Sequence, residues 1–303
     1  MGIKSHHNLS SECVNSLLTL ITDVLPENHK MPSNLYECKC ILNGLKMPYV
    51  KIDVCINNCM IYYKQNEYKE MCDFCEEPRF EVTEVENLGR KRMPVPRKVM
   101  RYLPFIPRLQ RMYMEPETAK HMRWHKEGHR EKPGIMVHPA DGEAWKHFDN
   151  ECSDFAMDPS NVRVALATDG FNPFGFSATQ YSCWPVFVIP LNLPPALCQE
   201  DENIYLSLVI PGPKHPGKNL NVFMQPISDE FVCAWIGVQT YDSYLKQNFN
   251  MRVSIHCSIH DLPAYGMFAG WSTHGGLACP ECMGDVDTIW LPNGHKYSWF
   301  DSH

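Results

Sequence analysis

The sequence predicts a mixed α/β (α+β) protein in which a small helical region and a cysteine-rich module precede an α/β core. Three observations carry this prediction. Apolar residues recur at helical spacing near the N-terminus, short Cys pairs follow them, and β-branched runs bounded by Pro and Gly dominate the second half. The changes in character place boundaries at 1–50 for the helical region, 51–88 for the cysteine module, 89–155 for a basic connection and 156–303 for the core.

Composition narrows the class of protein. The 303 residues are 44% hydrophobic, which is enough for a sizeable core, and the net charge of -7 argues against a uniformly basic coat. No apolar run reaches about 18 residues, so we expect no membrane span, and no apolar segment near the N-terminus indicates a secretory signal. The 14 cysteines then belong in a reducing compartment, where close Cys pairs more often bind zinc than form disulfides.

The N-terminal region reads as two helices. Apolar spacing predicts one helix over 10–24 with Ser10 or Ser11 as its N-cap, and a second from about Ser33, as its N-cap, to Leu45. Nothing in either segment points to chemistry, so a packing unit is the interpretation.

Two short Cys pairs follow, Cys55-x3-Cys59 and Cys72-x2-Cys75, with a β-type segment over 60–63 between them. Such knuckles each present two thiolates to one ion, and two knuckles complete a closed, structural zinc site of the zinc-ribbon kind. Four unpaired core cysteines are the alternative.

The stretch over 88–132 is basic and carries interleaved aromatic residues. Cationic and aromatic side chains are what a protein uses to contact phosphates and to stack on bases, so DNA contact is the functional reading. A solvated linker and helix face, broken up by prolines, is the alternative. The DNA-contacting candidates are Arg101, Arg108, Arg111 and Arg123.

Residues 134–155 mix His, Asp, Glu and Trp, but a turn at 139–142 followed by a short amphipathic helix explains them better than a metal site.

The core opens with an apolar strand from Val162 that delivers Asp169 to its C-terminal end, before a Gly-Phe-Asn-Pro turn. Runs at 181–191 and 205–210 read as two further strands of an antiparallel meander, and 222–245 as one or two helices. By itself this stretch favours Asp169 as an ordinary turn residue, because Asp-Gly and Asn-Pro favour turns.

A fourth strand is predicted over 251–259, and like the first it is followed by a carboxylate, Asp261. If the two strands are neighbours, Asp169 and Asp261 can share divalent cations. Mg²⁺ binds a few carboxylate oxygens and keeps room for substrate phosphate, and a pair of such ions activates a water or a 3′-hydroxyl.

The tail holds a further pair, Cys279-x2-Cys282, followed by His295 and His303. This set suits a second zinc knuckle of the Cys2His2 type. A reduced Cys pair with two surface histidines is the alternative.

Several blocks in a fixed order then resemble the transposases of CACTA (En/Spm-type) plant DNA transposons. The matching blocks are Ile52-Asp53-Val54-Cys55 to Cys75, Arg101-Tyr102-Leu103-Pro104-Phe105-Ile106-Pro107-Arg108-Leu109-Gln110-Arg111, Met122-Arg123-Trp124-His125, His138-Pro139-Ala140-Asp141-Gly142-Glu143-Ala144-Trp145, Asp169-Gly170-Phe171-Asn172-Pro173-Phe174-Gly175, and Asp261-Leu262-Pro263-Ala264-Tyr265-Gly266-Met267 to Cys282.

The resemblance implies an RNase H-like catalytic fold with an acidic triad, Mg²⁺ or Mn²⁺ at the acids, structural Zn²⁺, DNA at transposon ends as the partner and the nucleus as the location. Asp169 matches the first acid and Asp261 the second. The third acid should come later, and here Glu281, Asp285, Asp287 and Asp301 match it only in being acidic, so the core reads as partial. His260, directly before the second acid, and Asn58, within the first knuckle, depart from the pattern.

Two hypotheses therefore stand together. In the first, the chain is a transposase, or the N-terminal part of one, that cuts DNA at transposon ends and joins 3′-hydroxyls to target DNA. In the second, it is a non-catalytic remnant or a domesticated transposon protein that binds zinc and DNA. An unrelated zinc hydrolase is a third reading and would need an open zinc position. Assembly of the chain as a homo-oligomer is left open.

Overall fold

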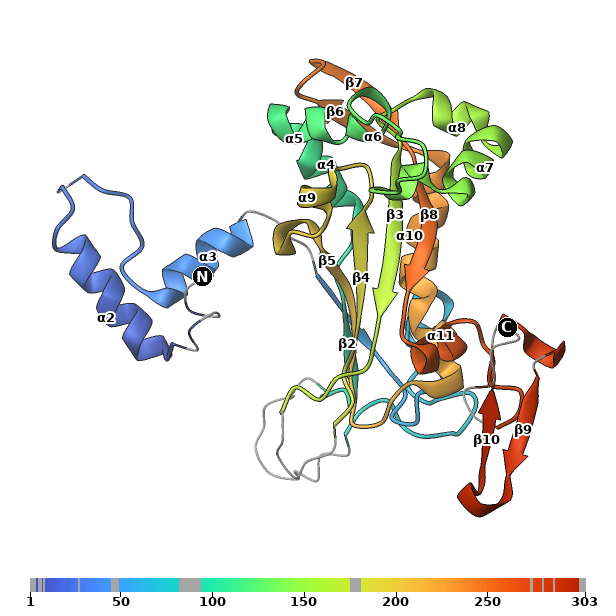
Figure 1. Cartoon of the computed structure of the whole chain (residues 1–303). Coiled ribbons are helices and arrows are strands. Elements are labelled where there is room, and N and C mark those ends of the chain that lie inside the picture. Colours follow the sequence, from blue (N-terminus) through green and yellow to red (C-terminus); the bar gives the residue numbers. More distant parts are fainter. Residues whose placement is uncertain are drawn as a thin grey trace, which may run out of the picture. The chain divides into compact units, whose positions relative to one another are not determined.

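The computed structural model describes residues 4, 7, 9–26, 28–44, 49–81, 94–174, 181–272, 275–279, 281–285 and 287–299. The chain divides into two compact units, Met1–Pro48 and Tyr49–His303 (Figure 1). No described helix is long and apolar enough to cross a membrane.

The first unit contains the two predicted helices, α2 (Ser11–Thr22) and α3 (Leu35–Gly44). Ser10 is the N-cap of α2, as predicted, because its hydroxyl accepts a hydrogen bond from Cys13 N at 3.1 Å. The prediction of Ser33 as the N-cap of the second helix is wrong, because the helix starts one residue later, at Leu35. Its capping oxygen is Asn34 Oδ1, which accepts from Glu37 N at 2.9 Å, while the hydroxyl of Ser33 binds the Glu37 carboxylate instead.

The second unit is built on a six-stranded mixed sheet with the order β1-β2-β5-β4-β3-β8, which confirms the predicted mixed α/β class (Figure 1). Neighbouring strands are antiparallel except β3 and β8, which are parallel. The strands of this sheet are β1 (Val50–Asp53), β2 (Val99–Tyr102), β3 (Val162–Thr168), β4 (Trp184–Pro190), β5 (Tyr205–Ile210) and β8 (Val253–Ile259).

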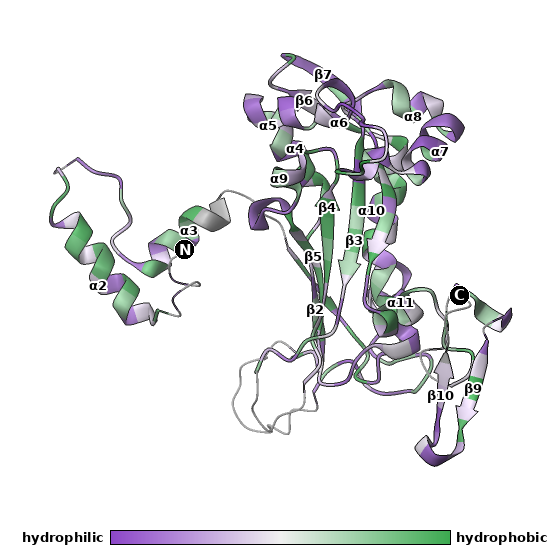
Figure 2. Cartoon of the chain, viewed as in Figure 1, coloured by the Kyte–Doolittle hydropathy of each residue, from purple (hydrophilic) through white to green (hydrophobic). Residues whose placement is uncertain are grey.

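The predicted meander is confirmed as β3, β4 and β5, in which Thr168 pairs with Val186 and Ile210 pairs with Trp184. These strands are apolar along most of their length (Figure 2), and β3 is buried at six of its seven positions. A strand covered on both faces loses the polar alternation of a half-exposed strand, which explains the continuous apolar run in the sequence.

The segment predicted as one or two helices is one helix followed by a hairpin. Helix α10 (Leu220–Ile236) ends at Gly237, whose φ of 117° is a conformation that L-residues rarely adopt. Beyond it β6 (Val238–Asp242) pairs with β7 (Gln247–Met251). Buried and exposed residues alternate along β6, and the sequence pattern of a half-buried strand was mistaken there for a helix.

Helix α10 is tied to the sheet through a buried carboxylate. Glu230 accepts hydrogen bonds from Phe105 N at 3.1 Å, from Ile106 N at 2.9 Å and from the Tyr102 hydroxyl at 2.5 Å. Burial raises the pKa of Glu230, and these three donors satisfy the carboxylate within the core. The connection between β2 and α4 is thereby fixed against the helix that links β5 to β8.

Shorter elements complete the second unit. The helices are α4 (Ile106–Met114), α5 (Pro116–His121), α6 (Trp124–Glu127), α7 (Glu143–Glu151), α8 (Ser153–Met157), α9 (Pro195–Cys198) and α11 (Leu262–Phe268), and a second hairpin consists of β9 (Thr288–Leu291) and β10 (Lys296–Trp299). Residues 60–63, predicted as a strand, contribute only an isolated bridge between Ile61 and Val54. Helices α4 to α8 gather at the end of the unit opposite to the C-terminal ends of β3 and β8 (Figure 1).

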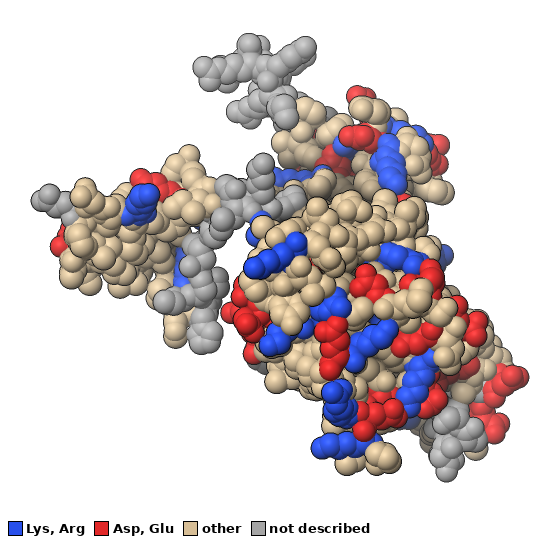
Figure 3. Space-filling model, turned by 90° about the horizontal axis from the view of Figure 1, so that it is seen from above, with Lys and Arg blue, Asp and Glu red and all other residues tan. Residues whose placement is uncertain are grey.

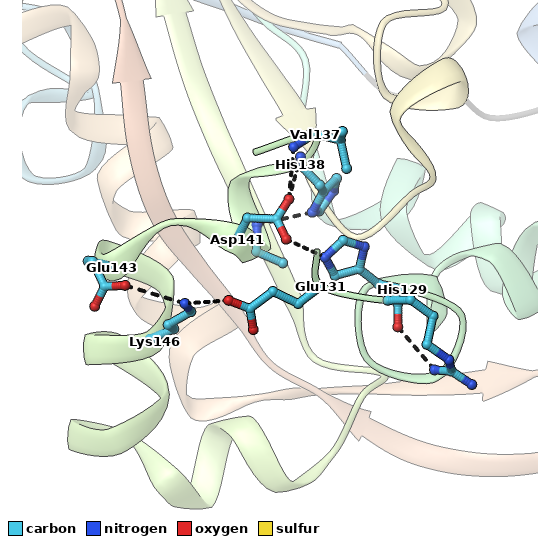
Figure 4. A network of polar contacts seen from close by, with 9 residues as sticks. His129, Glu131, Val137, His138, Asp141, Glu143 and Lys146 are labelled. Carbon is cyan, nitrogen blue, oxygen red and sulfur yellow. Dashed lines mark hydrogen bonds and ion pairs between the residues drawn. The ribbon is translucent and has the colours of Figure 1, made fainter. Parts of the chain in front are cut away.

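The turn predicted at 139–142 and the helix after it are both present, and they enclose a buried polar network (Figure 4). The Asp141 carboxylate accepts from Val137 N at 2.9 Å and from His138 N at 3.0 Å, and it lies 2.6 Å from His129 Nε2. These contacts, the backbone N–H of Val137 first, hold the pKa of Asp141 at about 2. The acidic and histidine residues of this stretch therefore cap and brace a turn.

Two histidines beside this network are buried and neutral. Burial lowers the pKa of His125 to about 3, helped by the charge of Arg163, and burial also lowers the pKa of His138. His125 packs against Trp145 with ring centroids 5.4 Å apart. The guanidinium carbon of Arg163 also lies over the Trp145 ring, 4.2 Å from its centroid. An imidazolium at His125 would be desolvated next to a guanidinium, so the folded state resists its protonation.

We expect stability to fall as the pH is lowered below about 6.5, the pKa of an unperturbed histidine. The unfolded chain then binds a proton at position 125 that the folded chain does not, and this difference costs about 2 kcal/mol at pH 5. Urea unfolding at pH 7.5 and pH 5 measures it. In His125→Gln the loss between the two pH values should be smaller by that amount.

His147→Gln is the matched control, because His147 lies on the same side of the molecule but is exposed. Its stability should change with pH as in the unaltered protein. An unchanged pH dependence in His125→Gln would contradict the assignment of a buried, neutral imidazole.

Candidate functional site

The parallel pairing of β3 and β8 brings the two strand-end carboxylates to one edge of the sheet. Ala167 pairs with Ile259, so Asp169 and Asp261 each stand two positions beyond the last paired residues. Both strands run in the same direction and point downward in Figure 1. The acids that follow them therefore lie at the same edge of the sheet.

Each carboxylate is oriented by a backbone N–H and keeps one oxygen available. Asp169 Oδ1 accepts from Gly170 N at 2.6 Å. Asp261 is the N-cap of α11, and its Oδ1 accepts from Ala264 N at 2.7 Å. Both side chains are exposed, and their second oxygens have no partner among the described residues. This arrangement suits carboxylates that bind a cation, since the free oxygens are fixed in direction without being neutralised.

Asp169 and Asp261 line one pocket of about 430 Å³. Its other walls are largely apolar and come from Phe171, Pro185 and Phe187. Apolar walls lower the local dielectric, which strengthens the attraction between a carboxylate pair and a cation. In the described part of the chain, neither aspartate belongs to a group of three or more carboxylate, His or Cys side chains at metal-ligand distance.

His260 is a further lining residue, for which the sequence indicated no role. Its Nδ1 lies 3.2 Å from Thr168 O, so this contact needs a proton on Nδ1. The ring packs against Phe268 with centroids 4.6 Å apart. His260 therefore ties the end of β8 to the end of β3. Only the register of the two strands could have indicated this contact.

The turn after Asp169 needs glycine at position 170. A Cβ there would lie 2.6 Å from the Trp184 ring, closer than real side chains approach. The Thr168 hydroxyl donates to Pro185 O at 2.7 Å and closes the strand end. The glycine of the Asp-Gly pair is therefore required by the nearby Trp184 ring as well as by the turn.

The structure brings together the four cysteines predicted as one metal site. The Sγ atoms of Cys55, Cys59, Cys72 and Cys75 all lie within 4.8 Å of one another, and those of Cys55 and Cys75 are 3.4 Å apart. Burial, with the neighbouring thiols, raises the pKa of Cys59 to about 12, since adjacent thiolates repel each other without a cation. A cluster of four closely spaced thiols in this geometry could hold a metal such as zinc in a closed site.

The longer first knuckle is explained by its backbone. Asn58, the additional residue before Cys59, has a φ of 64°, and Glu76, directly after Cys75, has a φ of 58°. Asn58 Oδ1 accepts from Lys98 Nζ at 2.5 Å, and that lysine is buried with its pKa lowered to about 8 by desolvation. A left-handed Asn held by a buried lysine therefore closes the C-x3-C turn.

The second Cys pair forms a compact turn in which Cys282 N donates to Cys279 Sγ at 3.4 Å. His295 lies in the turn between β9 and β10, with a φ of 45°, and is exposed. Within the described ranges His295 does not join the two thiols at ligand distance. His303 falls outside the described residues, so the Cys2His2 set stays a prediction.

The four arginines predicted to contact DNA are spread over β2, α4 and the start of α6. Arg101 is exposed on β2, whereas Arg108 and Arg111 are half-buried on α4. Arg123 binds Glu127 at 2.7 Å and the Ser160 hydroxyl. Three of the four thus belong to the helical end of the unit, where basic and acidic side chains are mixed (Figure 3). Their contacts with DNA stay predictions.

Comparison with known proteins identifies one family. The family model described as "Transposase family tnp2" matches residues 133–303, more than half of the 303-residue chain. No curated protein matches the chain. The matched range includes both strand-end aspartates and the second Cys pair, and it excludes the four-cysteine cluster.

The four-cysteine cluster predicts a bound metal that can be counted. Protein purified without chelator should hold zinc, and Cys59→Ser should lower its zinc content by about one ion per chain, because a site of four thiolates loses most of its affinity with one ligand. Mass spectrometry of the metal content measures this. Chelation should also lower the thermal midpoint by roughly 10 °C, since metal binding and folding are coupled.

Cys233→Ser is the matched control, because Cys233 is exposed on α10 and lies outside the cluster. It should keep the zinc content of the unaltered protein. Equal zinc content in both variants would contradict a metal site at Cys55, Cys59, Cys72 and Cys75.

Proposed function

The chain belongs to the tnp2 transposase family, and from this premise we propose that it cleaves DNA strands at transposon ends and transfers them to target DNA, with a divalent cation held by Asp169 and Asp261. The observation that carries the proposal is the common pocket of these two residues at the ends of adjacent parallel strands. The available oxygens point to Mg²⁺ or Mn²⁺, which bind few protein carboxylates and take the remaining ligands from water and phosphate.

The roles of the chain's own residues follow from their contacts. Gly170 N and Ala264 N fix the directions of the two carboxylates before any substrate arrives. His260 keeps the two strand ends together through Thr168 O. When bound, the cation would supply activation of a water or 3′-hydroxyl and would stabilise the leaving oxygen. The apolar walls of the pocket would limit the access of bulk water to the reacting phosphate.

The sheet supports an RNase H-like core as the finer proposal. Strands β5, β4 and β3 form an antiparallel meander, and β8 adds in parallel beside β3 after a helical crossover. This arrangement places acids from the first and fourth of these strands, in chain order, on one edge. A CACTA (En/Spm-type) assignment, action in the nucleus and assembly as a homo-oligomer belong to the same proposal and rest on the resemblance of the sequence blocks.

The four-cysteine cluster has a separate, structural place in the proposal. A zinc ion there would fix the segment that connects β1 to β2, and it would carry no open position for a substrate. The second Cys pair, with His295 and His303, is proposed as a further zinc knuckle that braces the segment after α11.

A non-catalytic remnant is the alternative function, and one observation favours it. Within the described residues, neither Asp169 nor Asp261 belongs to a group of three or more potential metal ligands. A protein of this kind would bind DNA and zinc and would leave DNA strands intact.

Strand cleavage in the presence of Mg²⁺ or Mn²⁺ is the expected activity on DNA that carries the element's terminal sequences. Asp169→Asn and Asp261→Asn should each lower the rate by roughly 100-fold or more, since a metal contributes several kcal/mol to such transition states. Gel analysis of nicked products measures the rate. Titration with Mn²⁺ followed by electron paramagnetic resonance should show weaker binding in both variants.

Asp201→Asn is the matched control, an exposed aspartate in the 3-10 helix before β5. It should retain both cleavage and Mn²⁺ binding. If the unaltered protein binds Mn²⁺ at these aspartates and binds DNA without cutting it, the remnant is the better description. If neither aspartate affects Mn²⁺ binding, the proposed site is wrong.

A further inference from the structure

The loop between β5 and α10, residues 211–219, carries cationic side chains that the protein itself does not use. Lys214 and Lys218 are exposed, as is His215 between them. Neither lysine forms an ion pair or a side-chain hydrogen bond with another described residue, in contrast to Arg97, Arg123 and Lys146, which all have carboxylate partners. Unpaired lysines on a short loop are available for an anionic ligand.

This loop leaves the sheet at the same edge as the two strand-end aspartates. Strand β4 runs antiparallel to both β3 and β5, so β3 and β5 end at one edge. The basic residues of α4 to α6 lie at the opposite end of the unit (Figure 1). Lys214 and Lys218 follow the last strand of the meander, so they lie at the same edge of the sheet as Asp169.

Backbone hydrogen bonds join the loop to the Asp169 turn without interruption. Phe171 N donates to Cys183 O at 2.9 Å, and Cys183 N donates back to Phe171 O at 2.8 Å. The next residue, Ser182, donates its N–H to Pro213 O at 2.8 Å. Neighbouring strands lie about 4.8 Å apart, so these two steps place the loop backbone roughly 10 Å from the turn that holds Asp169.

The loop is held in one conformation by its sequence. Pro211, Pro213 and Pro216 each fix φ, and Gly217 has a φ of 55°. Gly212 lies under Tyr181, since a Cβ there would be 2.7 Å from that ring. A loop restrained in this way loses little conformational freedom when it binds, which favours a preformed contact.

The two carboxylates that line the pocket give it a negative charge, which opposes the binding of a DNA phosphate. Two carboxylates repel a phosphodiester, so a DNA strand at Asp169 and Asp261 needs cations beside it as well as the metal between them. Phosphates recur at every nucleotide of a DNA strand, so a strand whose reacting phosphate lies at Asp169 and Asp261 brings a neighbouring phosphate within reach of a contact about 10 Å away.

We propose that Lys214 and Lys218 bind the phosphodiester backbone of the DNA strand, close to one side of the phosphate held at Asp169 and Asp261. This inference rests on the proposed function, because it takes the reacting phosphate as its reference point. The loop acts as a positioning contact that sets which phosphate of the strand enters the pocket, and the contact is independent of base sequence.

Fluorescence anisotropy of a labelled DNA duplex over a series of KCl concentrations tests the proposal. Each lysine that neutralises a phosphate contributes about 0.9 to the slope of log K against log salt concentration. Lys214→Gln/Lys218→Gln should therefore lower the magnitude of the slope by about 1.8 and weaken binding most at low salt. Thermal unfolding should be unchanged, because both side chains are exposed.

Lys39→Gln/Lys246→Gln is the matched control. It removes the same charge from two exposed lysines, on α3 and in the β6–β7 turn, and both lie outside the basic stretch 88–132. Its slope should equal that of the unaltered protein. An equal slope in the loop variant, or an equal decrease in both variants, would overturn the loop contact and leave the proposed function standing. Absence of salt-dependent DNA binding by the unaltered protein would remove both proposals.

Discussion

The parallel pairing of β3 with β8 is the constraint on which the candidate site depends. Antiparallel neighbours send their ends to opposite edges, whereas a parallel pair delivers both ends to one edge. A parallel pair also needs a crossover, and α10 supplies it, tied to the rest of the sheet by the buried carboxylate of Glu230. The His260–Thr168 contact then closes the pair at the edge itself. The two acids reach one edge because the strands between them in the chain do not separate β3 from β8. Strands β4 and β5 pair on the other side of β3, and β6 and β7 form a hairpin of their own.

The second unit separates its roles between the two ends of the sheet. One end gathers α4 to α8, where arginines are paired with acids and histidines are buried in neutral form. The other end carries the acid pair, and the segment from β1 that holds the four cysteines leaves the sheet there too, since β1 and β5 both run antiparallel to β2. The groups that suit metal ions and phosphates are thus concentrated where strands end. Side chains at the helical end are used to stabilise the fold.

Much of the fold could be predicted because its signals are local. Ser10 caps its helix as expected, β3 and β5 begin and end at the predicted residues, and the close spacing of Cys55 with Cys59 and of Cys72 with Cys75 indicated one site. The errors came where local signals are ambiguous. Strand β6 shows a mixed apolar pattern that fits a helix equally well, and only the conformation of Gly237 ends α10 before it.

The sequence by itself determined the chemistry that is available. It supplies a carboxylate directly after each of two apolar strands, two Cys knuckles and a family assignment. Tertiary structure alone decided which of these groups meet. Strand order is a long-range property that short-range sequence patterns do not encode. The packing of the chain sets the register that brings Asp169 and Asp261 to one edge, and it places Lys214 and Lys218 at the same edge. It also places Arg123 at the opposite end of the sheet, where it pairs with Glu127. Residues that read alike in sequence, exposed lysine and ion-paired arginine, are separated by that packing into different roles.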